Sequence, residues 1–160
     1  MIKHEIKGDD QVIAALNKIS NAKMRAEIMD EIGSYGVSST QQRFLDEQSP
    51  DGENWVQSFR AKQDGGSTLR DNSYLFQSLS HIFSSDSAAW GSNKIYAAIQ
   101  HFGGVIKAKK AKALRFSMGG NVYTKKQVTI PANPYLGIND DDRSNIEAIV
   151  QDGILGGLPS

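Results

Sequence analysis

The residue types that most often carry chemistry are few and scattered in this sequence of 160 residues. It has no cysteine, which excludes disulfides, thiol nucleophiles and thiolate metal ligands. The three histidines, His4, His81 and His101, lie far apart and lack the i, i+4 spacing of a helical zinc site. His101 precedes Phe102, and we interpret it as a packed or surface histidine rather than as a catalytic base.

One acidic run has the ligand type that divalent cations prefer. Asp140, Asp141 and Asp142 are consecutive, and their carboxylate oxygens suit Mg²⁺ or Ca²⁺. The run also suits the start of a helix, where free amide groups favour acidic side chains, and we adopt that interpretation. The stretch at Asp51 lacks the other ligands of a calcium loop. Phosphate-binding glycine loops and nucleophile elbows are also missing from the sequence. We therefore expect no catalytic, cofactor or metal site, and no enzyme.

A strongly basic segment is the most distinctive feature of the sequence. The formal net charge of the whole chain is +0, and subtracting seven positive charges in this segment leaves −7 for the rest. Such asymmetry predicts contact through charge with another molecule. Between His101 and Asp140 there is no Asp or Glu, and the basic residues are Lys107, Lys109, Lys110, Lys112, Arg115, Lys125 and Lys126.

The basic segment allows three interpretations. Binding to nucleic acid would neutralise several phosphates and weaken steeply with salt. However, the sequence pI is about 6.8, and aromatic residues are not interleaved with the lysines as in a single-strand binder. The second interpretation is a basic arm that is simply solvated. The third is an arm that docks on the acidic face of an identical neighbour, in head-to-tail contacts that close into a ring.

Hydrophobic periodicity predicts the elements that position these residues. Residues 2–6 alternate as in an edge strand, and a helix is expected to begin at Asp9. A longer helix is expected from about residue 24 to residue 45, with apolar side chains at spacings of three and four. Gly33 and Gly36 within it predict a close helix crossing or a bend, and a tolerated irregularity is the alternative.

The middle of the chain predicts a loop and several short elements. Residues 49–68 are rich in turn residues, and we interpret Trp55 as a plug of the core, with a subunit contact as the alternative. A short helix over residues 69–79 should precede two strands joined near Asp86. Ser92 or Asn93 should then cap another helix. One face of that helix carries apolar side chains, Ile95, Ile99 and Phe102.

The last third of the chain predicts an arm and a final helix. Residues 105–130 alternate around a Gly-Gly-Asn turn, which predicts a protruding basic β-hairpin. Pro131 and Pro134 enforce an extended path that places Tyr135 and Leu136 against apolar neighbours. The final helix should start at the acidic run, and residues 153–160 should form a flexible tail.

These elements predict one α+β domain over residues 1–160. N-terminal helices should pack on a small, mainly antiparallel sheet, with the protruding hairpin and a C-terminal helix. No apolar run approaches the roughly 20 residues needed to span a bilayer. The N-terminus lacks the apolar core of a signal peptide. We therefore expect no membrane contact.

Four motifs resemble one known family when they are taken in order. They are Phe44 with SPDGENW (49–55), LRDNSYLFQSL (69–79), WGSNKIYAAIQHFGG (90–104) and IPANPYLG (130–137). Their order and spacing resemble the phage virion morphogenesis family, the tail-completion proteins of Mu-like and related contractile-tailed phages. The second motif lacks a glycine usual in the family. In the third motif Trp90 replaces a valine and the order Gln100-His101 is inverted, and in the fourth Asn133 stands where the family commonly has arginine.

The resemblance implies a non-enzymatic structural subunit of the phage neck or tail end. Such a protein, made in the host cytoplasm, would act as a tail terminator or head–tail connector in a homo-oligomeric ring, expected to be a hexamer. Its partners would be further copies of itself, tail tube or sheath proteins and head-side connector proteins, with non-specific contact with packaged DNA. The alternative is a small DNA-binding accessory protein that uses the basic arm, residues 107–126.

Under this hypothesis the hairpin is an arm that lies on the adjacent subunit or in the lumen near DNA. Trp55, Tyr135 and Leu136 would be buried at its root or at the subunit contact. The full set of candidate interface residues is Trp55, Phe59, Tyr96, His101, Phe102, Tyr135 and Leu136.

Overall fold

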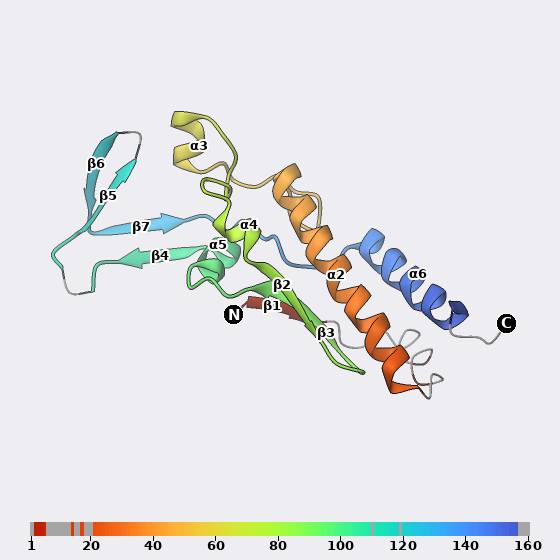
Figure 1. The fold of residues 1–160 in the computed structure, drawn as a ribbon. Coiled ribbons are helices and arrows are strands. Elements are labelled where there is room, and N and C mark those ends of the chain that lie inside the picture. The colour runs from red at the N-terminus through yellow and green to blue at the C-terminus, as the bar shows by residue number, and fades with distance from the viewer. Residues whose placement is uncertain are drawn as a thin grey trace.

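The chain folds into an α+β structure with an elongated body and a protruding arm (Figure 1). This computed structural model describes residues 2–5, 14, 17, 21–109, 111–118 and 120–156. Apart from residues 14 and 17, the helix predicted to begin at Asp9 lies outside the described residues. We use "arm" for residues 104–130 and "body" for the other described residues.

Helices and strands alternate irregularly along the chain. In order they are β1 (Ile2–Glu5), α2 (Ala22–Asp46), α3 (Phe59–Asp64), α4 (Tyr74–Gln77), β2 (Leu79–Phe83), β3 (Ala88–Ser92), α5 (Ala97–Phe102), β4 (Gly104–Lys107), β5 (Leu114–Met118), β6 (Asn121–Lys125), β7 (Gln127–Ile130) and α6 (Asp140–Gly156).

The body sheet has three antiparallel strands in the order β1-β3-β2. The predicted edge strand at the N-terminus and the predicted strand pair joined near Asp86 are both confirmed. Strand β3 is buried along its whole length because it is the central strand and α2 packs on it. The sheet therefore forms one layer under the long helix.

Two glycines in α2 mark where the helix touches this sheet. A Cβ atom on Gly33 would lie 2.5 Å from the His81 ring, and one on Gly36 would lie 2.3 Å from the Trp90 ring. Both distances are too short for a real side chain. The predicted close contact is therefore present, but its partner is the sheet and not a second helix.

Helix α6 lies along α2 on the side away from the sheet (Figure 1). Ile146 and Val150 are buried against Ile28 and its neighbours, and a Cβ atom on Gly153 would collide with Ile28. The helix continues to Gly156, so the first part of the tail predicted over residues 153–160 is helical. Residues 157–160 lie outside the described part of the chain.

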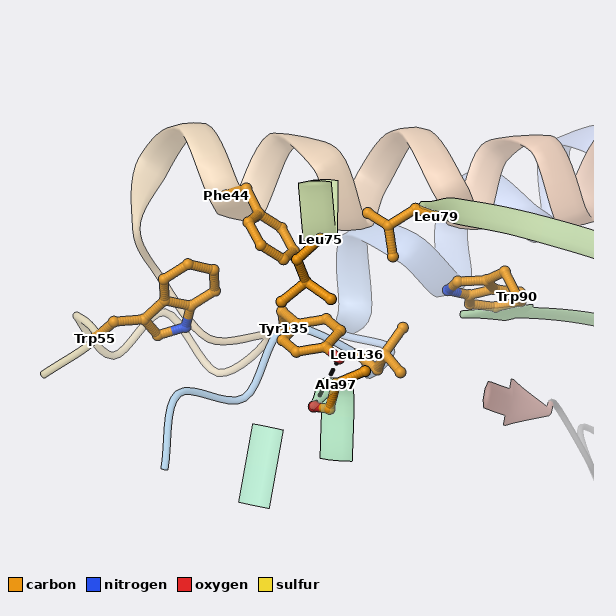
Figure 2. Close-up of a cluster of buried hydrophobic side chains, with 8 residues drawn as sticks. All are labelled: Phe44, Trp55, Leu75, Leu79, Trp90, Ala97, Tyr135 and Leu136. Carbon is orange, nitrogen blue, oxygen red and sulfur yellow. Dashed lines mark hydrogen bonds between the residues drawn. The ribbon is translucent and has the colours of Figure 1, made fainter. Parts of the chain in front are cut away.

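A second cluster fills the other end of the body, nearer the arm (Figure 2). Phe44 from α2 and Trp55 meet edge to face, with ring centres 5.2 Å apart. Trp55 is only 8% exposed, which confirms its prediction as a plug of the core. The eight members shown are Phe44, Trp55, Leu75, Leu79, Trp90, Ala97, Tyr135 and Leu136.

Several predicted boundaries differ from the structure. The predicted loop over residues 49–68 contains helix α3, and the helix predicted over residues 69–79 is reduced to the single turn of α4. The helix cap expected at Ser92 is wrong, because Ser92 ends β3 and its hydroxyl accepts from the Lys94 amide within a turn. Helix α5 therefore starts later, at Ala97.

The predicted apolar face of α5 is also wrong. Ile95 is 99% exposed and Phe102 is 70% exposed, whereas Ala97 is completely buried in the second cluster. Because the helix begins later than expected, Ile95 lies in the turn before it. The side of α5 that faces the body then carries the small Ala97.

Candidate functional site

The arm consists of two successive antiparallel ladders. The stem pairs β4 with β7, from Gly104 opposite Ile130 to Lys107 opposite Gln127. The tip pairs β5 with β6. The extent of the predicted hairpin is confirmed, but a single continuous ladder is not what forms. Residues 108–113 separate β4 from β5, whereas only Lys126 separates β6 from β7. This unequal insertion acts like a large bulge, and the tip turns away from the direction of the stem (Figure 1).

The arm leaves much of its own surface uncovered. Val105 in the stem is 48% exposed and Val122 in the tip is 56% exposed. A two-stranded ladder alone is marginally stable in water, so further packing would be expected to support it. The basic side chains of the arm that the structure describes are all exposed: Lys107, Lys109, Lys112, Arg115, Lys125 and Lys126. Lys110 lies outside the described residues.

A hollow of about 790 Å³ separates the arm from the loop that carries α3. Phe59 on α3 bridges its two sides, because its ring meets the edge of Tyr123 in the tip with centres 6.1 Å apart. Lys62 and Arg115 add positive charge to the lining. The main apolar lining residues are Phe59, Leu69, Tyr74, Tyr96, Ile106 and Phe116. The hollow is therefore a largely apolar cleft whose lining also carries the ion pair of Arg60 with Asp71 and the basic side chains of Lys62 and Arg115.

The arm returns to the body through residues 131–137, a segment that we call the clasp. It has no strand partner among the described residues, so its polar backbone groups find other partners. The amide of Asn133 donates to the Gln100 carbonyl at 3.0 Å. The Asn133 side chain pairs with both backbone groups of Val56, at 2.8 and 3.2 Å. The Trp55 indole donates to the Pro134 carbonyl at 2.8 Å.

Helix α5 holds the next part of the clasp. The ring atom Nδ1 of His101 accepts from the Tyr135 amide at 3.2 Å, and the Tyr135 hydroxyl donates to the Ala97 carbonyl at 3.0 Å (Figure 2). His101 is thus a packed histidine, as predicted. Burial raises the pKa of Tyr135 well above its usual range, so its hydroxyl stays protonated as a donor.

A buried ion pair fixes the last part of the clasp. Arg43 of α2 binds the Asp142 carboxylate and also donates to the carbonyls of Tyr135, at 3.2 Å, and Gly137, at 2.9 Å. Burial alone would raise the pKa of Asp142, but hydrogen bonds from Ser39 and the Asn139 amide, together with the Arg43 charge, lower it below its usual value.

The acidic run therefore has two roles. Helix α6 starts at Asp140, as the sequence predicts, and the Asn139 side chain accepts from the Asp142 amide at 2.8 Å. Asp142 itself points into the body toward Arg43, while Asp140 and Asp141 are exposed. Among the described residues, no group of three or more His, Cys, Asp or Glu side chains is placed to hold a metal ion.

The predicted interface residues fall into three places. Trp55, Tyr135 and Leu136 lie in the second core cluster at the root of the arm. Phe59 and Tyr96 line the hollow. His101 is packed on the clasp and Phe102 is exposed beside it. Of the basic residues, Arg115 also lines the hollow.

The sequence did not single out two of the most important residues around the clasp. Arg43 lies next to Phe44 in α2, and nothing in its spacing indicates a partner 99 positions away. Asn133 was noted only as a departure from the family pattern, whereas its amide side chain makes two hydrogen bonds to Val56. The place of an asparagine between two prolines was the one available signal.

These features define an α+β protein with a closed body and a protruding basic arm. The chain belongs to the phage virion morphogenesis family, which matches residues 8–154. It is similar to Mu-like prophage FluMu G protein 2 of Haemophilus influenzae, with 28% identity over 153 residues that cover 95% of each chain. No solved structure matches the chain significantly. The family is one of structural virion proteins and is not a known enzyme family.

No helix within the described ranges is long and apolar enough to cross a membrane.

Proposed function

We propose that this protein is a structural subunit of the phage neck or tail end. Several copies, expected to be six, form a ring that completes the tail and joins it to the head. The arm is the observation that carries this proposal, because it extends exposed apolar and basic side chains away from a body whose own core is closed. The likeness to a Mu-like prophage protein over 95% of the chain supports a role in a related phage.

A ring subunit needs a stable body and a surface that reaches its neighbours. The body is stable at the root of the arm because hydrogen bonds of Arg43, Trp55 and Asn133 join the clasp to the rest of the body. The hollow and the exposed face of the arm supply the second. In this proposal the protein contacts further copies of itself, tail tube or sheath proteins and head-side connector proteins.

Assembly on purified tails tests the proposal directly. The full-length protein is incubated with tails that lack it, and electron microscopy then examines the head-proximal end for a ring. A matched variant, in which a short Gly-Ser linker replaces residues 111–125, retains the body and the stem. We expect a ring with the wild-type protein and none with the variant. A wild-type protein that stays monomeric in solution and adds nothing to the tails would contradict the proposal.

DNA binding by the arm is the second candidate function, and the exposed basic side chains of the arm favour it. Replacing Lys107, Lys109, Lys110 and Lys112 with glutamine should then abolish a salt-sensitive gel shift. The wild-type protein must show that shift at about 50 mM salt, and its absence there would remove this candidate.

A further inference from the structure

The outer face of α6 is acidic. The helix buries Asp142, Ile146 and Val150 against α2. Its only basic residue is Arg143. The acidic side chains on its solvent face are all exposed: Asp140, Asp141, Glu147 and Asp152. Within the described part of the chain none of these four acids forms an ion pair, whereas Asp30, Asp71 and Asp86 pair with His81, Arg60 and Arg25.

The arm has the opposite character. Its six described basic side chains are exposed, and none of them forms an ion pair with another described residue. The sequence from residue 102 to residue 139 contains no acid, so the arm cannot neutralise itself. Among the described residues, the acidic face thus has no basic partner in an ion pair and the basic arm has no acidic one.

Their positions prevent the two surfaces from meeting within one copy. The arm projects from one end of the body and α6 runs toward the other end, on the far side of α2 (Figure 1). A contact between them must join different copies, with different surfaces on each side. Contacts of this head-to-tail kind generate rings when the rotation closes.

The two surfaces have similar lengths. The four acids of α6 lie between residues 140 and 152, which at 1.5 Å per residue is about 18 Å of helix. The tip ladder has five residue pairs, from Leu114 opposite Lys125 to Met118 opposite Asn121, so each strand spans four residue steps, about 14 Å. One tip can therefore lie along the acidic part of one helix.

We propose that the arm of one copy docks along the acidic outer face of α6 in the next copy. This inference rests on the proposed function and names the contact that would build the ring. The arm lysines and Arg115 lie against Asp140, Asp141, Glu147 and Asp152 of the neighbour. Complementary charge of this kind fixes register and speeds association. The contact weakens as salt rises, because it involves exposed charges.

Zero-length cross-linking gives the first test. A carbodiimide joins a lysine amine to a carboxylate only when they are in contact. Copies labelled with ¹⁴N and ¹⁵N are mixed, cross-linked on tails and in solution, and digested. We expect mixed-isotope peptides that join residues 107–126 to residues 140–152. Rings whose mixed-isotope cross-links lack α6 would overturn the inference and leave the proposed function intact.

Charge exchange gives the second test. The arm variant carries Lys112→Glu and Lys125→Glu, and the helix variant carries Glu147→Lys and Asp152→Lys, away from the helix start. Each variant alone should raise the dissociation constant for self-association about tenfold or more, because like charges then face each other. One chain carrying all four substitutions should recover to within about threefold of the wild-type value.

The matched control exchanges charge at acids that lie outside α6. Glu31→Lys with Asp51→Lys changes two exposed acids outside α6 and should leave association unchanged. If self-association is weakened equally in the arm variant and in the four-substitution chain, the arm binds another surface and the inference is wrong. If the arm variant and the four-substitution chain both lose DNA binding, and the helix variant associates as the wild type does, the arm binds DNA and not α6. A wild-type protein that never associates, even on tails, would overturn both the inference and the proposed function.

Discussion

The body and the arm differ in how far the chain covers its own side chains. In the body, Phe44 and Tyr135 are completely buried and the charged pair of Arg43 and Asp142 is enclosed. In the arm, apolar residues such as Val105 are about half exposed and the described basic side chains reach solvent. The body therefore encloses a core of its own, whereas none of the described side chains of the arm is buried. Substitutions in the body should change the free energy of unfolding, and substitutions in the arm should change assembly.

The largest effect is expected from the buried ion pair. Asp142→Asn should lower the free energy of unfolding by about 3–5 kcal/mol, because it leaves the Arg43 charge buried without its partner. Urea denaturation followed by circular dichroism measures the change. Asp141→Asn is the matched control, since Asp141 is exposed in the same helical turn, and it should change stability by less than about 0.5 kcal/mol. Equal losses in the two variants would mean that the pair does not stabilise the body.

Acid should remove the same contribution. The pKa of Asp142 is lowered in the folded protein, so the pair stabilises the fold fully above about pH 4, the ordinary aspartate value. The stabilisation is lost as the pH falls through the lowered folded-state pKa. The stability difference between wild type and Asp142→Asn should therefore be constant at neutral pH and shrink below about pH 4. Urea denaturation of both proteins over this pH range measures the difference. A stability difference that grows in acid would contradict a lowered pKa for Asp142.

A smaller loss is expected where α2 touches the sheet. Gly36→Ala places a Cβ atom 2.3 Å from the Trp90 ring, so the helix and strand β3 must separate. Overpacking of this kind costs about 1–3 kcal/mol in thermal or urea unfolding. Gly156→Ala is the control, because nothing lies within 4 Å of its added methyl group. That control should be neutral or slightly stabilising, since alanine favours a helix more than glycine does. A loss of the same size at both sites would mean that the contact with Trp90 is not its cause.

The contact between the body and the tip should have a weaker effect. Phe59→Ala removes the ring that meets Tyr123 across the hollow. Because Phe59 is half exposed, we expect a loss of about 1 kcal/mol or less. Hydrogen exchange is the sharper measurement, with faster exchange in β5 and β6 and no change in α2. Unchanged exchange in the tip would mean that Phe59 does not order it.

Removing the tip itself is expected to have a similarly small effect on stability. Replacing residues 111–125 with a Gly-Ser linker deletes mostly exposed surface together with the Phe59–Tyr123 contact, so the free energy of unfolding should change by about 1 kcal/mol or less. Ring formation on tails should nevertheless be lost. A large loss of stability would show that the arm is part of the body's folding unit, and the contrast between the two regions would then fail.

Local patterns predicted the elements of this fold better than its contacts. The final helix, the body strands and the extent of the arm follow from periodicity and from turn residues such as Gly120. The two glycines of α2 indicated a close contact but not its partner. Neighbouring residues decide local structure, while a partner on a distant element depends on the assembled core.

Around the candidate site, the missed features all depend on distant contacts. The pairing of Arg43 with Asp142 and the hydrogen bonds of Asn133 to Val56 join segments that are 99 and 77 residues apart. The division of the arm into two ladders depends on the unequal lengths of chain between their strands, which alternation alone does not reveal. The exposed face of α5 was missed because its start was placed too early.

The root of the arm has a mechanical consequence. A pull along the stem would be shared by two covalent backbones in parallel, because both strands run along it. The ladder hydrogen bonds lie across the strands and would not be opened one after another. The load would enter the body at α5 and at the clasp, which are themselves tied by the 3.0 Å hydrogen bond from Asn133 to Gln100. The force that the arm withstands therefore depends on its attachment to the body at α5 and the clasp, and not on the hydrogen bonds between its own strands.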